Sequence, residues 1–189
     1  MSSLLEVEFK FRDIDLPTVE KRLTQLDAVP EGIREEVDLY FAHPTRDFSQ
    51  TDEALRIRRI GDRNWITYKG PKIDTISKTR DEIELPLTDG REAWESWKTL
   101  LERLGFRPVR QVAKRRKRFR LTWEGWSVEI SLDEVADLGA FVELEIVCEH
   151  EKMAAARDAL SRLAAELGLH TGERRSYLEL LLQTQQQKV

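Results

Sequence analysis

Hydrophobic and charged residues alternate near the start of the chain. Over residues 5–12, leucine, valine and two phenylalanines occupy every second position, and Glu6, Glu8 and Lys10 stand between them. A β-strand turns successive side chains to opposite faces, so this period of two predicts a strand with one apolar face and one charged face.

The same alternation returns in later segments of the chain, which are separated by short turns. Gly61 begins one of these turns, a hairpin between two of the segments. Together with the first segment, we expect about eight strands, and the later ones cover residues 35–42, 54–60, 65–69, 78–85, 112–121, 126–133 and 140–147.

Helical spacing of apolar residues predicts the remaining elements. Pro17 lies in the first turn of a helix-like stretch, and Trp94 and Trp97 lie on one face of another, where we expect them to pack in the core. The expected helices cover residues 15–27, 91–104 and 151–167, and a short docking helix covers 176–182. We expect one α+β domain over 1–182, an antiparallel barrel with helices outside, and a Gln-rich tail over 183–189 that frays.

Composition narrows the class of protein. The chain has 189 residues, a formal net charge of -4 and a pI near 5.6, which argue against a general duplex-binding protein. The basic run from Lys114 to Arg118 alternates between strand faces, so we do not expect nucleic acid as the ligand. Cys148 is the single cysteine, and the sequence contains neither a signal peptide nor an apolar run long enough to span a bilayer. We therefore expect a soluble, cytoplasmic protein without a membrane partner.

The charged strand faces allow two interpretations. They could face solvent while the apolar faces form the core, as in a half-exposed antiparallel sheet. Alternatively, amphipathic helices cover the apolar faces on the outside, and the charged faces line the barrel. Charges of both signs are costly in an empty, dry interior, and they become sensible if a polyanion and a cation bind there.

The two kinds of charge suit different ligands. Arginine and lysine bind phosphate oxygens, and clustered carboxylates bind a hard divalent ion such as Mg²⁺ or Mn²⁺. The sequence has no glycine-rich phosphate loop, because Gly70-Pro71-Lys72 does not match a Walker motif.

Six charged blocks in a fixed order resemble those of the CYTH family, the triphosphate tunnel enzymes. The first is Glu6-x-Glu8-x-Lys10, a weak signal when it stands alone. The later blocks are Leu55-Arg56-Ile57-Arg58, Tyr68-Lys69-Gly70-Pro71, Arg80-x-Glu82-x-Glu84, Lys114-x-Arg116 and the stretch from Leu132-Asp133-Glu134-Val135 to Glu143-x-Glu145. Within the family, the chain is most similar to bacterial class IV adenylyl cyclases.

The resemblance implies a closed eight-stranded antiparallel tunnel and gives its charged residues roles. Glu6, Glu8 and Lys10 are candidate catalytic residues, and the roles of Glu82 and Glu84 stay open. The implied phosphate ligands are Lys10, Arg56, Arg58, Lys69, Arg80, Lys114 and Arg116. The implied ligands of Mg²⁺ or Mn²⁺ are Glu6, Glu8, Asp133, Glu143 and Glu145.

The resemblance leaves the reaction open. A cyclase would convert ATP to cyclic AMP and pyrophosphate, whereas a triphosphatase would hydrolyse tripolyphosphate or thiamine triphosphate. A non-catalytic binder of polyphosphate or of RNA 5′-triphosphate ends is the third alternative, although such a binder would not need the carboxylates. The resemblance is also compatible with a homodimer.

Overall fold

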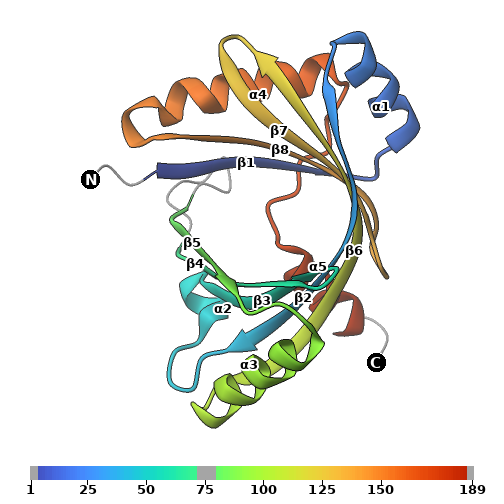
Figure 1. The fold of residues 1–189 in the computed structure, drawn as a ribbon. Helices are drawn as coiled ribbons and strands as arrows, with labels where there is room; N and C mark the ends of the chain where they lie inside the picture. The colour runs from blue at the N-terminus through green and yellow to red at the C-terminus, as the bar shows by residue number, and fades with distance from the viewer. Residues whose placement is uncertain (1–3, 72–79, 187–189) are drawn as a thin grey trace.

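A computed structural model describes residues 4–71 and 80–186 of the chain. Within these residues, one antiparallel sheet of eight strands is accompanied by helices (Figure 1). The strands are β1 (Leu4–Arg12), β2 (Val29–Ala42), β3 (Ala54–Ile60), β4 (Arg63–Lys69), β5 (Glu82–Leu87), β6 (Arg107–Trp123), β7 (Trp126–Val135) and β8 (Gly139–Glu149). The helices are α1 (Leu16–Gln25), α2 (Phe48–Thr51), α3 (Arg91–Arg103), α4 (Met153–Glu166) and α5 (Tyr177–Gln186), with a 3₁₀ turn η1 (His150–Lys152).

The sheet is strongly curled but open. Its strand order is β1-β8-β7-β6-β2-β3-β4-β5, so β1 and β5 are the two edges, and Figure 1 shows the sheet curling round so that these edges approach each other. Among the described residues, one isolated bridge, between Glu6 of β1 and Arg80 just before β5, links the two edges. The predicted closed barrel is therefore wrong for this structure.

The C-terminal segment occupies one part of the free edge of β1, at residues 10–12. It follows the free edge of β1, where Phe11 bridges Gly172 and the N–H group of Glu173 donates to the carbonyl oxygen of Lys10 over 2.7 Å. These backbone groups of β1 already have partners, so β5 cannot bond to them.

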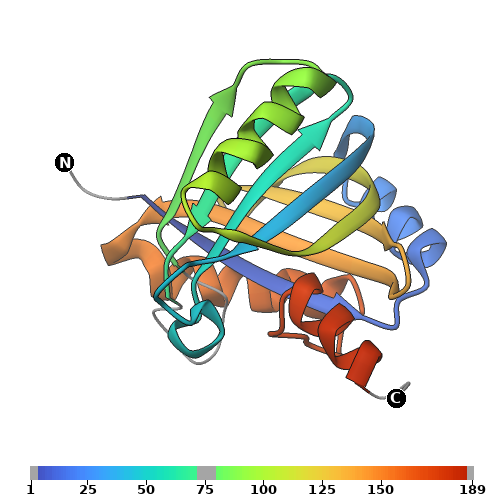
Figure 2. The same ribbon diagram turned by 90° about the horizontal axis from the view of Figure 1, so that it is seen from below.

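The convex side of the sheet carries α1 and α4, as the apolar strand faces predict (Figure 2). The apolar residues of β1 and β8 pack against α4, whose buried positions recur every three or four residues. On the other half of the sheet, Trp94 and Leu101 of α3 pack on Leu55 and Ile57 of β3. Trp94 is thus a core residue, as predicted, and Trp97 packs against the same cluster.

The helix α5 occupies a different place, because it packs on the concave side of the sheet. Tyr177, Leu180 and Leu181 contact Tyr40, Val112, Val135 and Phe141. The last three belong to the same strand faces as the charged residues of β6, β7 and β8. This helix therefore covers one end of the sheet's interior.

Several strands are longer than predicted, and β2 and β6 extend furthest beyond their predicted bounds. The strand predicted over 35–42 begins earlier, because β2 starts at Val29 and accommodates Pro30 and Gly32 at a β-bulge opposite β6. Gly32 has a φ of 107°, which a residue with a side chain adopts only at a cost. Part of the strand predicted over 78–85 lies outside the described residues, as does the end of the predicted tail. Among the described helices, none combines the length and the apolar character needed to cross a membrane.

Candidate functional site

The charged strand faces point into the sheet's interior and line one cavity of about 480 Å³. Lys10, Lys114 and Asp133 are at most 4% exposed, which excludes the solvent-facing interpretation for these residues. Of the predicted site residues, Asp133 lies behind the lining, and the others all reach the cavity: Glu6, Glu8, Lys10, Arg56, Arg58, Lys69, Arg80, Lys114, Arg116, Glu143 and Glu145.

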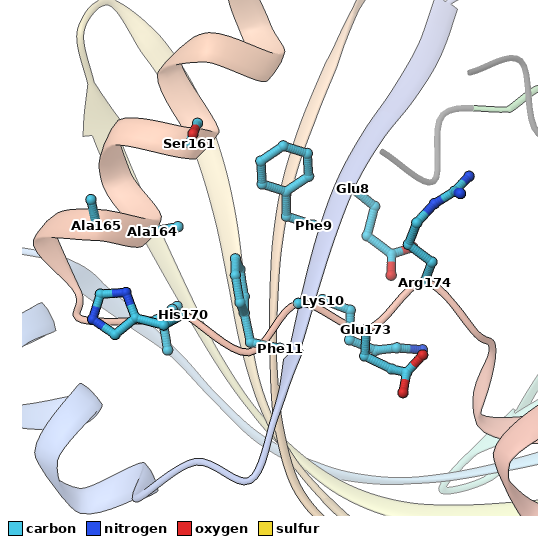
Figure 3. A pocket seen from close by; sticks show the side chains of 12 residues that line it. Glu8, Phe9, Lys10, Phe11, Ser161, Ala164, Ala165, His170, Glu173 and Arg174 are labelled. Carbon is cyan, nitrogen blue, oxygen red and sulfur yellow. The ribbon is translucent and has the colours of Figure 1, made fainter. Parts of the chain in front are cut away.

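The strand β1 separates the two environments that its alternation predicts. Figure 3 shows Phe9 and Phe11 on the side of α4, and Glu8 and Lys10 on the opposite side of the strand. A second hollow, of about 540 Å³, lies between Phe9, Phe11 and the small residues of α4. Glu8 and Lys10 border this hollow as well as the concave cavity, whereas the other predicted residues that line the concave cavity do not reach it.

One side of the cavity is built from arginines that buried carboxylates hold in place. Arg58 forms a two-pronged bond with Asp38, with Nε to Oδ1 at 2.7 Å and Nη2 to Oδ2 at 2.8 Å. Arg116 forms the same arrangement with Asp133, at 2.7 and 2.5 Å. Bidentate pairs fix the plane of the guanidinium group, so both arginines are held in one orientation.

The sequence analysis did not predict two buried carboxylates of the site, Glu36 and Asp38. Glu36 and Asp38 lie on β2, each 1% exposed, and Lys114 Nζ lies 3.1 Å from Glu36 Oε2. Burial alone would raise the pKa of Glu36, but Lys114, Arg116 and Arg58 outweigh burial and lower it well below its ordinary value. Burial opposes Arg56 and Arg58 in the same way at Asp38, where the arginines again lower the pKa. The alternation of residues 36–39 could have placed both on the charged face.

Arg56 has a donor without a partner. Its Nη1 lies 3.3 Å from both Asp38 Oδ2 and the Tyr40 hydroxyl group. Its Nε is buried and has no hydrogen-bond partner among the described residues. A buried, unsatisfied donor on an arginine that lines a cavity suits an anionic oxygen of a ligand.

The opposite side of the cavity is acidic. Glu8 stands directly opposite Glu145, which stands directly opposite Glu129, so three carboxylates form a row across β1, β8 and β7. Like charges at such positions repel one another. Burial, joined by Glu129 and Glu8, raises the pKa of Glu145 to about 7 against the opposing effect of Lys69. Burial also raises the pKa of Glu6 well above its ordinary value.

Lys69 and Arg80 lie between the two edges of the sheet. Lys69 Nζ is 2.6 Å from Glu82 and 3.4 Å from Glu6. Burial would lower the pKa of Lys69, but these two carboxylates raise it above its ordinary value. Arg80 donates to the carbonyl oxygens of Asp52 and Gly70, so its guanidinium group holds backbone as well as lining the cavity.

Tyr177, which the sequence analysis placed in a docking helix and not among the site residues, forms the floor of the cavity. Its hydroxyl group donates to Asp133 Oδ2 over 2.8 Å. The Nζ atoms of Lys10 and Lys114 lie 4.3 and 5.2 Å from the centre of its ring. Lys10 Nζ also donates to the carbonyl oxygen of Arg175. No local pattern marks this role, because it depends on where α5 docks.

The five predicted metal ligands fall into two groups. Glu6, Glu8 and Glu145 lie on the acidic side, whereas Asp133 and Glu143 both accept hydrogen bonds from Arg116. As the side chains lie, no three His, Cys, Asp or Glu residues in the described part of the chain converge on a metal position.

Comparisons with known proteins agree with this fold. The chain is 37% identical over 180 residues to a Methanocaldococcus jannaschii protein named putative adenylate cyclase, covering 94% of this chain and 98% of that one. A solved structure from Pyrococcus horikoshii shares 42% identity with a TM-score of 0.81, covering 95% and 99% of the two chains.

A more distant structure shares the fold alone. It is a protein of Hippeastrum described as a putative adenylyl cyclase with a dominant triphosphatase activity, and it has 15% identity and a TM-score of 0.67 over 96% of each chain. The family model of the CYTH domain matches residues 4–177, from the first residue of β1 to Tyr177 on the cavity floor. The chain therefore belongs to the CYTH domain family.

Proposed function

We propose that this chain is a metal-dependent enzyme that binds a triphosphate in the concave cavity and acts as an adenylyl cyclase. The observation that carries the proposal is the set of oriented cations on one side of a single cavity, with Arg56 Nε still lacking a partner there. Phosphate oxygens are the ligands that such a set fits. The 37% identical relative named putative adenylate cyclase supports the choice of reaction.

The balance of charge supports a metal ion as the cofactor. Among the described residues that line the cavity, nine are basic and seven are acidic. Glu36, Asp38 and Asp133 do not line the cavity, but they form ion pairs with several of these basic side chains. Because the bases are already largely compensated, a bound triphosphate adds uncompensated negative charge, which a divalent cation would offset.

The acidic side offers suitable donors for Mg²⁺ or Mn²⁺. Both ions prefer carboxylate oxygens, and the row of Glu8, Glu145 and Glu129 places three carboxylates on neighbouring strands. Glu6 lies next to this row on β1. Glu129 is paired with Arg118 and Arg120, so side-chain rotation would be needed to bring it to the other two. The mutual repulsion of Glu8 and Glu145 favours a cation between them. When bound, the metal ion would neutralise charge on the phosphate oxygens.

The chain's own residues would bind and orient the substrate. In the cyclase reaction the ribose 3′-hydroxyl group attacks the α-phosphorus atom and pyrophosphate leaves. Lys10, Arg58 and Arg116 would stabilise the charge that develops on the phosphate oxygens, because buried partners already hold them in position. A carboxylate of the acidic side, Glu6 or Glu8, would accept the proton of the attacking hydroxyl group.

A triphosphatase is the second candidate. The Hippeastrum protein with the same fold is described as having a dominant triphosphatase activity. In that reaction water attacks the γ-phosphorus atom, and the same cations would stabilise the transition state. The geometry of the cations does not distinguish the two reactions, so the products must be identified.

The decisive experiment is to identify the products. The protein is incubated with ATP, tripolyphosphate or thiamine triphosphate, with and without Mn²⁺, and the products are resolved by phosphorus NMR. Metal-dependent formation of cyclic AMP and pyrophosphate is expected, whereas orthophosphate release would replace the cyclase by the triphosphatase. Tight binding without turnover of any substrate would contradict both and leave a non-catalytic binder.

A further inference from the structure

The two ends of the cavity differ in character. At one end, α5 covers the interior face of the sheet, and Val112, Val135 and Phe141 are at most 4% exposed. At the other end, Leu4 and Val147 are 62% and 56% exposed, although both line the same cavity. The cavity therefore has a closed floor and an open rim.

Two exposed aliphatic residues stand at the rim of a cavity that is lined mainly by charged side chains. In the register of β1 and β8, Glu6 stands opposite Val147 and Leu4 opposite Glu149, so Leu4 and Val147 are diagonal neighbours on one face. Among the described residues that line the cavity, they are the only aliphatic ones larger than alanine. Exposed aliphatic side chains gain free energy when a ligand covers them.

The order of residues along β1 gives the cavity a direction. From rim to floor the interior positions are Leu4, Glu6, Glu8 and Lys10, with Lys10 over the ring of Tyr177. The strand covers about 20 Å over these six steps. Lys10 and Lys114 thus lie at the floor beside Tyr177, Lys69 lies beside Glu6, and the apolar surface lies at the rim.

On the basis of the proposed function, we infer that Leu4 and Val147 select triphosphate esters over inorganic triphosphate. The terminal phosphate is directed to the floor beside Lys10 and Lys114, and the organic group lies against Leu4 and Val147. The ligand class is a triphosphate ester whose organic group has an apolar face, such as a nucleoside triphosphate. Inorganic tripolyphosphate has no group that could use this surface.

The test compares two ligands on a polar rim. A double variant, Leu4→Gln with Val147→Thr, keeps the side-chain volumes and removes the apolar surface. The dissociation constants of ATP and of tripolyphosphate are measured by titration calorimetry with Mn²⁺. We expect ATP binding to weaken by about tenfold and tripolyphosphate binding to stay within about twofold of the wild type.

A matched control variant separates the rim from general effects on the fold. Ile33 and Leu85 are 51% and 55% exposed but do not line the cavity, so Ile33→Thr with Leu85→Gln makes the same kinds of change elsewhere. We expect this control to bind both ligands like the wild type.

Several results would overturn the inference. Equal weakening of both ligands by the rim variant, or unchanged ATP binding, would show that the rim does not select the ester. A wild-type protein that binds tripolyphosphate but not ATP would also overturn it, while leaving a triphosphate site in place. A wild-type protein that binds neither ligand would overturn the proposed function as well.

Discussion

The hydroxyl group of Tyr177 donates a hydrogen bond to Oδ2 of Asp133, 44 positions earlier in the chain, over 2.8 Å. Asp133 also holds Arg116 by a two-pronged bond. The first residue of α5 is therefore connected through one carboxylate to a cation of the site. Docking of the C-terminal helix and the geometry of the cavity depend on the same contacts.

Substitutions of Tyr177 separate its hydroxyl group from its ring. Tyr177→Phe removes the hydrogen bond but keeps the ring beside Lys10 and Lys114, so we expect a loss of about 1–3 kcal/mol in the free energy of unfolding. Tyr177→Leu also removes the ring contacts, and we expect it to weaken tripolyphosphate binding severalfold more than the phenylalanine variant. Urea denaturation and titration calorimetry measure the two effects. Identical tripolyphosphate affinities of the two variants would show that the ring does not position the lysines.

Asp38 holds Arg56 and Arg58, and no other carboxylate in the described part of the chain lies as close to either arginine. Asp38→Asn leaves Arg56 and Arg58 buried beside a neutral amide, and we expect the free energy of unfolding to fall by about 3–5 kcal/mol. Tripolyphosphate would replace the lost negative charge, so its stabilising effect should exceed that on the wild type. Thermal unfolding with and without tripolyphosphate measures this difference.

The control for Asp38 is an exposed aspartate. Asp137 has a side chain that is 76% exposed and lies 3.8 Å from Arg110, so Asp137→Asn should change neither stability nor the effect of tripolyphosphate by more than a few tenths of a kcal/mol. If both variants respond to tripolyphosphate like the wild type, Arg56 and Arg58 are not phosphate ligands.

Glu145 should destabilise the ligand-free protein at neutral and higher pH. Its pKa is about 7 in the folded protein, against an ordinary value of 4.5, because of burial and the neighbouring Glu129 and Glu8. A raised carboxyl pKa gives stability that is fully present below pH 4.5 and is lost as the pH rises through about 7. We therefore expect Glu145→Gln to be more stable than the wild type at pH 8, by about 1–3 kcal/mol, and less so at pH 5.

The same substitution tests the assignment of metal ligands. Glu145→Gln should abolish metal-dependent turnover while the fold persists, which circular dichroism can verify. Glu134→Gln, at an acid of β7 that is 59% exposed and pairs with Arg115, is the matched control and should leave both turnover and the pH profile unchanged. Full turnover in the Glu145 variant would remove this residue from the metal site.

Glu143 gives a different expectation because Arg116 is its partner. Glu143→Gln should also abolish metal-dependent turnover if it is a metal ligand, as the family resemblance implies. If its main role is to orient Arg116, turnover should instead fall at subsaturating substrate and recover as the substrate concentration rises. A substrate titration of the variant at saturating Mn²⁺ separates the two roles.

Strand periodicity predicted which residues share the cavity, because a residue's face follows from its position within a strand. The alternation around Glu6, Glu8 and Lys10 already contains the division into an apolar and a charged face, and the structure confirms it. The order of the charged blocks then led to the family. The face of a strand residue depends on its neighbours in the sequence, and the order of the blocks depends only on their positions along the chain. Both can therefore be predicted from the sequence.

The partners of each charge could not be predicted in the same way. Asp38 pairs with Arg58 because β2 and β3 are in a register that places them opposite, and a longer connection with α2 joins these strands. Hydrophobic patterning does not fix a register across such a connection. The floor formed by Tyr177 and the occupied part of the free edge of β1 depend on the path of the C-terminal segment, which leaves no periodic signal.

The near balance of charge in the cavity leads to a final prediction about metal and ligand together. Because nine basic side chains face seven acidic ones, with three more carboxylates behind them, a triphosphate alone should raise the melting temperature only slightly. Mn²⁺ alone should also have a small effect, since the nearby cations repel it. Added together, they should stabilise the protein by more than the sum of their separate effects, because each ligand compensates the charge of the other.

Thermal unfolding without ligand, with Mn²⁺, with tripolyphosphate and with both measures this coupling. In the last condition, Mn²⁺ and tripolyphosphate are premixed at a fixed ratio. Purely additive shifts would mean that the triphosphate binds without the metal ion, and the acidic side would then lose its proposed role.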